Sequence, residues 1–405
     1  MIFRSIVFSI FVLLPSGLFG QSAEDTAASK SNRVTTELTK VDGSRLKADD
    51  VSIVDGKIST KDGQFDLNEF RLIDFSKPIQ ESASPKVVLG LSGGGKLMAK
   101  TVRLDDDAFV VDNVAGEMSV GVEAVTQIVF KQEPLSLFAN TKPKSDVDQL
   151  VVKIKGNYQT VSGIVESISE SEIKILYEED SIQFKIDDAY GLVLARDLDL
   201  DEPETNGVIV LTDGSKVTCM LEGMADDQVT ATLGELTEIV LPLPVISKIE
   251  IRSDRLAFLS DITPKSVSEI EGSVFKRQWR SDLNIVGGPL VLRDRVTKTT
   301  RTYTKGLGTK SGMKLQFDNT GFDRFVALLG IDASTNGNGD CKVLVFGDGK
   351  KLYESRITGN ESPKKLDIEI SGIESLELNV EFGDDFLDLS DHLNWCDARF
   401  VKNPK

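Results

Sequence analysis

The residues best suited to chemistry lie in one acidic segment near the end of the chain, residues 383–392. Its sequence, GDDFLDLSDH, holds four carboxylates and ends at His392, the only histidine of the chain. Carboxylates accept hydrogen bonds from sugar hydroxyl groups, and they are also ligands that Ca²⁺ prefers. Asp side chains equally cap turns in solvent-exposed loops. The segment is therefore a candidate sugar-binding rim, a candidate Ca²⁺ site through Asp384, Asp388 and Asp391, or an exposed loop.

A sugar site also needs a flat apolar group on which the C–H face of the ring can stack, and Trp or Tyr serves this purpose. Trp395 follows the acidic segment, but it lies in an alternating run of residues that favours a place in the core. His392 could be a buried partner of the adjacent aspartate or a sugar contact, and the sequence favours neither. Tyr303 and Lys305 precede a glycine-rich turn and could line the same rim.

Short β-strands must position these residues. Alternating or apolar runs, separated by Gly, Asp or Asn, occur at residues 314–317, 325–331, 342–346, 366–370, 376–382 and 395–401. Asp348-Gly349 is a strong signal for a two-residue hairpin. The turn Gly306 to Gly308 is not a phosphate loop, because no helical pattern follows it. These features predict a β-sandwich at the end of the chain.

Residues 256–402 resemble the NPCBM family of exported bacterial proteins. The matching residues, in chain order, are Leu259-Ser260-Asp261, Pro264, Gly287-Gly288-Pro289-Leu290, Tyr303, Lys305, Gly306-Leu307-Gly308-Thr309, Ser311, Phe317-Asp318, Phe322, Phe325, Gly330-Ile331-Asp332, Val345-Phe346, Asp348-Gly349-Lys350, Gly383-Asp384, Asp391-His392, Trp395 and Asp397-Ala398-Arg399. The chain departs from the family pattern at Lys310, where the family usually has His, and at Ala333, where it often has a second acidic residue.

The resemblance implies a galactose-binding-like β-sandwich, or jelly roll, that binds a polysaccharide or other glycan. The residues expected to bind the ligand are Tyr303, Lys305, Lys310, Asp332, Asp384, Asp391, His392 and Trp395. No cofactor is implied, apart from the Ca²⁺ considered above. If the family histidine contacts the sugar, Lys310 alters or removes that contact.

The preceding part of the chain shows a weak internal repeat. We expect four small β modules, at residues 34–78, 86–131, 149–197 and 206–255. Each reads as short strands bounded by Asp/Gly turns, and such strands could close into a small barrel that is Sm-like in outline. Their common residues are turn residues, so catalysis is not expected there. The modules are either scaffold or a protein-binding region that uses a strand edge or a groove between copies.

The start of the chain indicates export. Residues 1–20 combine Arg4, an apolar run and a Pro-Ser-Gly break, as in a signal peptide, and residues 21–33 form a polar leader. No second apolar stretch predicts a membrane span. Cys341 and Cys396 could form a disulfide in an oxidising compartment, or all three cysteines, with Cys219, could be small buried residues.

Composition excludes some functions. The chain has 64 acidic and 47 basic residues and a net charge of −17, so phosphate backbones would repel it and no nucleic-acid partner is expected. It has no region left for a glycosidase scaffold, so we expect no enzyme. The sequence predicts a periplasmic or extracellular carbohydrate-binding protein. The alternative is a cell-envelope scaffold that binds envelope proteins and no sugar.

Overall fold

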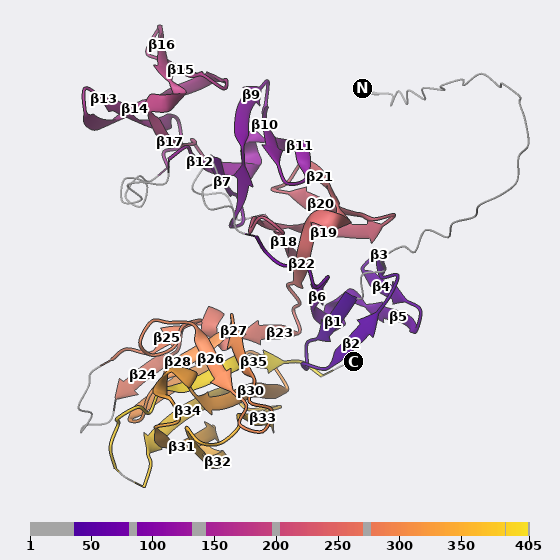
Figure 1. Ribbon diagram of the computed structural model, residues 1–405, viewed down its shortest axis with the longest axis vertical. Coiled ribbons are helices and arrows are strands. Elements are labelled where there is room, and N and C mark those ends of the chain that lie inside the picture. Colours follow the sequence, from indigo (N-terminus) through magenta and orange to yellow (C-terminus); the bar gives the residue numbers. More distant parts are fainter. Residues whose placement is uncertain are drawn as a thin grey trace, which may run out of the picture. The chain divides into compact units, whose positions relative to one another are not determined.

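β-Strands make up nearly all the regular structure of the chain (Figure 1). The structure is a computed structural model, and it describes residues 36–80, 87–131, 143–196, 203–269, 277–384 and 386–403. In these ranges the helical segments are short 3₁₀ turns, and none is a helix long and apolar enough to cross a membrane. The predicted all-β fold is confirmed. The predicted signal peptide and leader lie outside the described residues.

Four groups of strands, here called repeats 1 to 4, precede the C-terminal domain. Repeat 1 comprises β1 (Thr36–Lys40), β2 (Arg45–Ala48), β3 (Ser52–Val54), β4 (Lys57–Thr60), β5 (Gly63–Asp66) and β6 (Phe70–Asp74). Repeat 2 comprises β7 (Val87–Leu91), β8 (Gly95–Ala99), β9 (Thr101–Asp105), β10 (Ala108–Asn113), β11 (Gly116–Gly121) and β12 (Val125–Val129). Repeat 3 comprises β13 (Asp148–Ile154), β14 (Asn157–Ile168), β15 (Glu172–Tyr177), β16 (Asp180–Lys185) and β17 (Ala189–Val193). Repeat 4 comprises β18 (Gly207–Leu211), β19 (Lys216–Ala225), β20 (Gln228–Leu233), β21 (Thr237–Pro242) and β22 (Ile246–Ile251).

The four repeats share one topology. In each, the first strand pairs antiparallel with the second strand and with the last strand. A 3₁₀ turn directly precedes the last strand, at η1 (Leu67–Glu69), η2 (Val122–Ala124), η3 (Ile186–Asp188) and η4 (Leu243–Val245). Because side chains alternate across a strand, every second residue enters the core, and Leu38 and Ile73 in repeat 1 are fully buried.

Local sequence explains the hairpin between the first two strands. In repeat 4, the carboxylate of Asp213 accepts a hydrogen bond of 2.8 Å from the N–H of Ser215. Gly214 follows with a φ of 91°, a conformation that costs glycine little. Asp42, Gly43 and Ser44 form the same turn in repeat 1. The Asp-Gly-Ser signal in the sequence is therefore a turn signal, as predicted.

The repeats join through strand edges, and not in sequence order. β6 of repeat 1 pairs with β22 of repeat 4, β19 of repeat 4 pairs with β8 of repeat 2, and β12 of repeat 2 pairs with β17 of repeat 3. One hydrophobic cluster includes buried residues from all four repeats. The order of pairing is thus 1–4–2–3, which the sequence pattern did not reveal.

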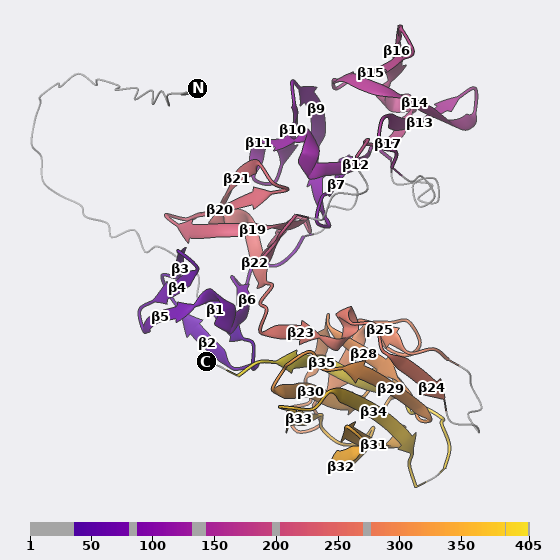
Figure 2. The ribbon, with the colours of Figure 1, turned by 180° about the vertical axis from the view of Figure 1, so that it is seen from behind.

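The C-terminal domain contains two main antiparallel sheets (Figures 1 and 2). One sheet contains β25 (Arg280–Ser281), β28 (Gly306–Thr309), β35 (Leu393–Val401), β30 (Arg324–Ile331), β33 (Lys364–Glu369) and β23 (Leu256–Phe258). The other contains β24 (Ser266–Glu269), β29 (Met313–Asp318), β34 (Ser375–Phe382), β31 (Asp340–Gly347) and β32 (Lys350–Thr358). The hairpin β26 (Leu290–Arg293) and β27 (Thr300–Tyr303), with η5 (Leu259–Asp261) and η6 (Ala333–Thr335), completes the domain.

Alternating side chains from both sheets form the core of this domain. Phe317 and Leu378 from one sheet, and Phe325 and Phe400 from the other, are fully buried in one cluster. Such interdigitation is the usual core of a β-sandwich. The predicted hairpin at Asp348-Gly349 connects β31 and β32. The predicted β-sandwich is confirmed.

Candidate functional site

The glycine-rich turn forms β28, a strand that the preceding loop covers closely. β28 pairs with β25 on one side and with β35 on the other. A Cβ atom on Gly308 would lie 2.4 Å from the carbonyl oxygen of Leu283, which is closer than atoms can approach. Gly306 has a φ of 145°, where other residues are strained. Gly308 therefore lets the loop at residues 282–288 lie directly on the sheet, and Gly306 lets β28 lie close to Trp395 on β35.

An open depression of about 540 Å³ lies beside this loop. Its lining residues are Arg277, Gln278, Arg280, Ile285 and Val286. The lining thus combines two guanidinium groups and a carboxamide with two aliphatic side chains. Between the polar residues, Trp279 is half-buried and packs against the core of the sandwich.

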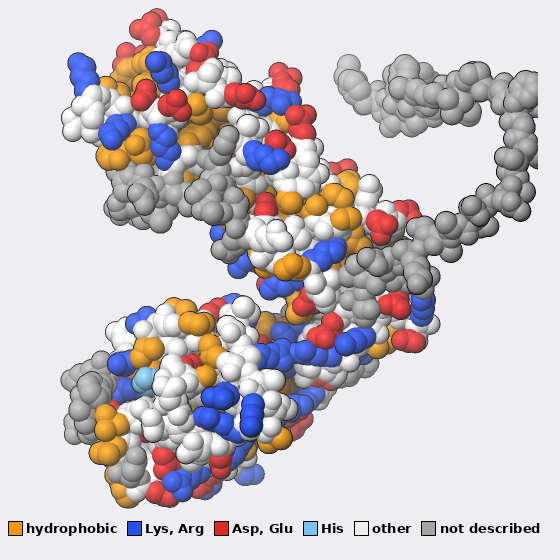
Figure 3. Space-filling model, in the orientation of Figure 1, with side chains coloured by type: hydrophobic (Ala, Val, Ile, Leu, Met, Phe, Trp, Pro, Cys, Tyr) orange, Lys and Arg blue, Asp and Glu red, His pale blue; other side chains and the backbone are white. Residues whose placement is uncertain are grey.

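The depression is electropositive. Among the described residues, no carboxylate lies within ion-pairing distance of Arg277 or Arg280, although the chain carries a large excess of acidic residues. Figure 3 shows further Lys and Arg side chains grouped on the visible face of the C-terminal domain. Burial lowers the pKa of His392, and the nearby Arg277 guanidinium lowers it further. His392 is therefore neutral at pH 7 and lies close to Arg277.

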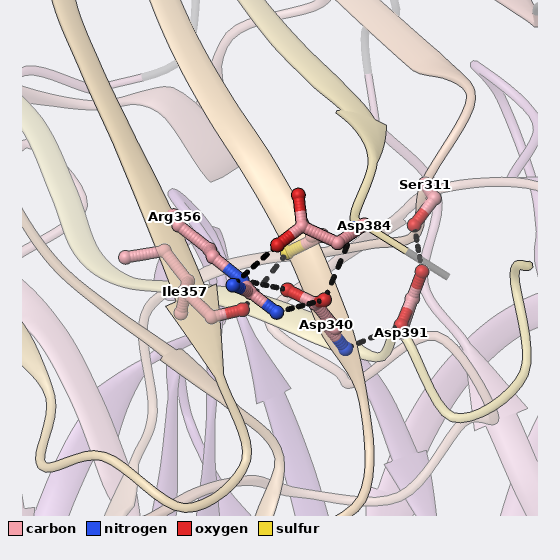
Figure 4. Close-up of polar contacts among 7 residues, drawn as sticks. Ser311, Asp340, Arg356, Ile357, Asp384 and Asp391 are labelled. Atoms are coloured by element: carbon pink, nitrogen blue, oxygen red, sulfur yellow. Dashed lines mark hydrogen bonds and ion pairs between the residues drawn. The ribbon is translucent and has the colours of Figure 1, made fainter. Parts of the chain in front are cut away.

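Lys310, which stands where the family usually has His, is buried in an ion pair. Its Nζ atom lies 3.3 Å from Oδ2 of Asp388, and the two side chains are only 3% and 1% exposed. The neighbouring Ser311 donates a hydrogen bond to the buried carboxylate of Asp391, which also accepts one of 2.7 Å from the backbone N–H of Asp340 (Figure 4). Lys310 and Asp391 therefore hold the acidic segment to the sandwich and are not open to a soluble ligand.

Asp384 belongs to an ion-pair cluster at the open end of the β31–β32 hairpin, away from its turn (Figure 4). Arg356 forms two hydrogen bonds with Asp340, of 2.7 and 2.6 Å, and its third nitrogen lies 2.5 Å from Asp384. Hydrogen bonds from Arg356 lower the pKa of Asp340 against the opposing effect of burial. Asp384 is thus paired with a protein cation.

The three carboxylates predicted to bind Ca²⁺ have separate partners. Asp384 pairs with Arg356, Asp388 with Lys310, and Asp391 with Ser311. In the part of the chain that the structure describes, no group of three His, Cys, Asp or Glu residues is placed to hold a metal ion. The alternating acidic sequence therefore does not become a convergent set of oxygen ligands.

Trp395 and Asp332 also serve the structure. Trp395 is fully buried, its indole N–H donates to Oγ1 of Thr309 over 3.0 Å, and its ring lies near Phe325. Asp332 is buried, caps η6 through the N–H of Ser334, and accepts a hydrogen bond of 2.6 Å from Asn394. Neither side chain offers a surface to a sugar in solution. The alternation of strand β35 places Trp395 in the core, as that pattern favoured.

Tyr303 and Lys305 do not line the depression. Tyr303 is half-buried at the end of β27, with the Arg301 guanidinium 5.1 Å from its ring. Lys305 forms ion pairs with Asp261 and Asp282. Burial acts against the Lys305 cation, but the hydrogen bonds to the two carboxylates outweigh it and raise the pKa of Lys305.

Of the eight residues predicted to bind ligand, none is among the lining residues, and His392 is close enough to Arg277 for that guanidinium to lower its pKa. The lining residues were not predicted, because they come from the two-residue strand β25 and from the irregular segments on either side of it. One sequence signal pointed to them, namely the concentration of basic residues between 276 and 305 in an acidic chain.

The cysteines are not paired. Cys219, Cys341 and Cys396 are all free and buried. Cys341 lies on β31 and Cys396 on β35, which belong to different sheets of the sandwich. Burial raises the pKa of Cys219 to about 12, so this thiol is unreactive at neutral pH.

Comparison with known proteins identifies the domain. Residues 255–401 match the NPCBM/NEW2 domain, which confirms the resemblance seen in the sequence. No curated protein matches the chain.

Three solved structures illustrate the structural neighbours. CBM51 from Clostridium perfringens GH95, in complex with methyl-galactose, is 24% identical, and the match covers 36% of this chain and 99% of that one, with a TM-score of 0.33. The tandem CBM51 modules of the Streptococcus pneumoniae Sp3GH98 are 15% identical over 78% of this chain and 88% of that one, with a TM-score of 0.33. CBM51-2 and INT domains of C. perfringens ZmpB, in complex with GlcNAc, are 20% identical over 50% of this chain and 39% of that one, with a TM-score of 0.34.

Proposed function

We propose that this chain is an exported, non-catalytic glycan-binding protein. The C-terminal domain binds the glycan, and the four repeats are its scaffold. One observation carries the proposal: within the NPCBM/NEW2 domain, the loop over β28 forms an open depression lined by arginines and aliphatic side chains. Export rests on the signal-like sequence of residues 1–20.

The lining residues suit a sugar ring. The guanidinium groups of Arg277 and Arg280 and the carboxamide of Gln278 supply donors for hydroxyl or acid oxygens. Ile285 and Val286 provide an apolar surface for the C–H groups of the ring, and almost half of the Val286 side chain is exposed. A shallow site of this mixed composition is suited to a glycan chain that lies on the surface.

The charge of the site favours an acidic glycan. Two arginines without a described carboxylate partner can each form a two-fold hydrogen bond with a carboxylate or sulfate group. Such contacts weaken as salt screens the charges, whereas stacking and apolar contacts do not. The preferred ligands are therefore polysaccharides that carry uronic acid or sulfate groups.

A glycan array that contains matched neutral, carboxylated and sulfated glycans tests this proposal. The chain without its signal peptide should bind acidic glycans, and Arg277→Ala and Arg280→Ala should each reduce the affinity at least tenfold. Arg293→Ala, an exposed arginine on β26 outside the depression, is the matched control and should bind normally. Absence of glycan binding, or binding that the two depression variants leave unchanged, would refute the proposal.

A second function is favoured by the repeats. Their strand edges join four modules through one core, an arrangement suited to an envelope scaffold that binds proteins. If the chain captures an envelope protein but binds no glycan on the array, this second function replaces the first.

A further inference from the structure

The contacts between repeats follow a symmetric rule. The β-bulge between the first and last strands marks the same position in each repeat. In the second residue pair from the bulge, the equivalent residues on the last strand are Ile73, Ile128, Leu192 and Ile249. In the pairing of repeats 1 and 4, Ile73 lies opposite Ile249, and in the pairing of repeats 2 and 3, Ile128 lies opposite Leu192. Equivalent residues therefore meet at both contacts, so each pair of repeats has a local two-fold axis.

The contact between repeats 2 and 4 obeys the same rule with a different strand. Lys96 on β8 lies opposite Lys216 on β19. These two lysines occupy equivalent positions in their repeats. Lys96 pairs with Gly90, and Lys216 pairs with Val210. Gly90 and Val210 are each the first-strand residue directly before the bulge. A Cβ on Gly95 would lie 2.4 Å from the carbonyl oxygen of Lys216, so glycine permits this close approach.

The repeats thus alternate two kinds of symmetric contact. Last strands meet between repeats 1 and 4 and between repeats 2 and 3, and second strands meet between repeats 4 and 2. All four last-strand edges are occupied. The second-strand edges at β2 and at residues 157–160 of β14 have no such partner among the described strands. Elsewhere, repeats 1 and 4 also pair at Ile53 and Met224, and β14 lies against β9 of repeat 2.

The two remaining edges differ in their surroundings. The turn before β2 is packed against the C-terminal domain: Arg399 donates a hydrogen bond of 2.9 Å to the carbonyl of Val41, and Arg71 pairs with Asp397. The edge of β14 is open. Residues Asn157 to Thr160 are all exposed, and their described pairing is with β13 on the opposite edge.

Exposed apolar side chains support a partner for repeat 3. Tyr158 and Ile164 on β14 are 40% and 55% exposed, and Tyr177 on β15 is 46% exposed. An open strand edge flanked by apolar groups readily accepts another strand. In repeats 2 and 4 the equivalent edges, on β8 and β19, pair with each other.

We propose that the β14 edge of repeat 3 pairs antiparallel with the same edge of a second copy of this chain. The resulting homodimer continues the alternation of symmetric contacts beyond repeat 3. In repeat 3, Thr160 occupies the position that Lys96 and Lys216 have in repeats 2 and 4. Thr160 pairs with Val151, which is the residue of the first strand, β13, directly before the bulge. The two-fold axis of the dimer therefore passes between the two copies of Thr160. This inference does not depend on glycan binding.

Sedimentation analysis of the chain without its signal peptide tests the proposal. Wild type should form a concentration-dependent dimer. Thr160→Glu should raise the dissociation constant at least tenfold, because it places two like charges opposite each other on the axis, whereas Thr160→Val should not. The like charges of Lys96 and Lys216 are tolerated because one chain holds both repeats together, whereas a contact between two separate chains lacks this high effective concentration. The proposal would be overturned if the wild type stayed monomeric at every concentration up to about 100 µM, a range that covers weak dimers. A dimer that Thr160→Glu leaves intact would also overturn it.

Cysteine cross-linking locates the axis. Thr160→Cys should give a disulfide-linked dimer on mild oxidation, since the three native cysteines are buried and do not compete. Ser119→Cys, an exposed position on the edge strand β11 of repeat 2, is the control and should remain monomeric on a denaturing gel. Equal cross-linking of both variants would contradict the assigned axis.

Discussion

The buried ion pair between Lys310 and Asp388 gives the sharpest stability prediction. Both side chains are almost fully excluded from water, with their charged atoms 3.3 Å apart. Lys310→Met removes the cation and leaves the Asp388 carboxylate buried. Removal of one partner of a buried ion pair typically costs about 3–5 kcal/mol of the free energy of unfolding, or about two to four orders of magnitude in the folding equilibrium. Replacement of both partners by apolar residues, as in Lys310→Met with Asp388→Leu, should recover most of this loss.

Tryptophan fluorescence measures the effect without interference from the repeats. The two tryptophans, Trp279 and Trp395, both belong to the C-terminal domain, so urea unfolding followed by their emission reports this domain. Lys314→Met is the control. Its Nζ atom lies 3.9 Å from Glu377 with both side chains over a third exposed, so its loss should cost less than about 1 kcal/mol. If Lys310→Met is as stable as the control, or if the double variant is no more stable than the single one, the reasoning fails.

Three further predictions concern the loop over β28, His392 and the three cysteines, of which Cys219 lies in repeat 4. Gly308→Ala should destabilise it and abolish glycan binding, because the new Cβ displaces the loop over β28; unfolding and array binding measure the two effects. The pKa of His392 is lowered in the folded state, so the unfolded chain binds more protons between the folded pKa and 6.5. The free energy of unfolding should therefore fall as the pH drops through that window. Urea titrations at several pH values should show this fall, and His392→Gln should remove it. The three free cysteines should react with a thiol reagent only after unfolding, and reduction should not alter stability; reaction of native Cys341 or Cys396 would contradict their burial.

Local patterns predicted the sandwich well. Alternation placed β29, β30, β31, β34 and β35 near their observed positions, because a strand that faces a core on one side must alternate. The same alternation favoured a core position for Trp395. The Asp-Gly and Asp-Gly-Ser turns were also readable, since their chemistry is local.

Long-range partners could not be predicted in this way. Lys310 and Asp388 are far apart in sequence, and nothing local in either segment indicates that each neutralises the other. The acidic segment therefore looked like a ligand rim, whereas its described carboxylates, Asp388, Asp391 and Asp384, bind Lys310, Ser311 and Arg356. The arginine-lined depression was missed for a related reason, because irregular segments lack periodicity.

The pairing order of the repeats was hidden for the same reason. Each last strand has the same inward alternation, which fits its own first strand and says nothing about its outer edge. Pairing of β6 with β22 joins residues that are distant in sequence. A weak repeat in the sequence thus predicted the modules but not their partners.

Hydrogen exchange of the whole chain, with and without the acidic glycan that binds best on the array, distinguishes the depression from the acidic segment as the glycan site. Bound glycan should protect backbone amides of residues 277–286, around the depression, and leave residues 383–391 unchanged. Protection confined to residues 383–391, with residues 277–286 exchanging as in the free chain, would contradict it.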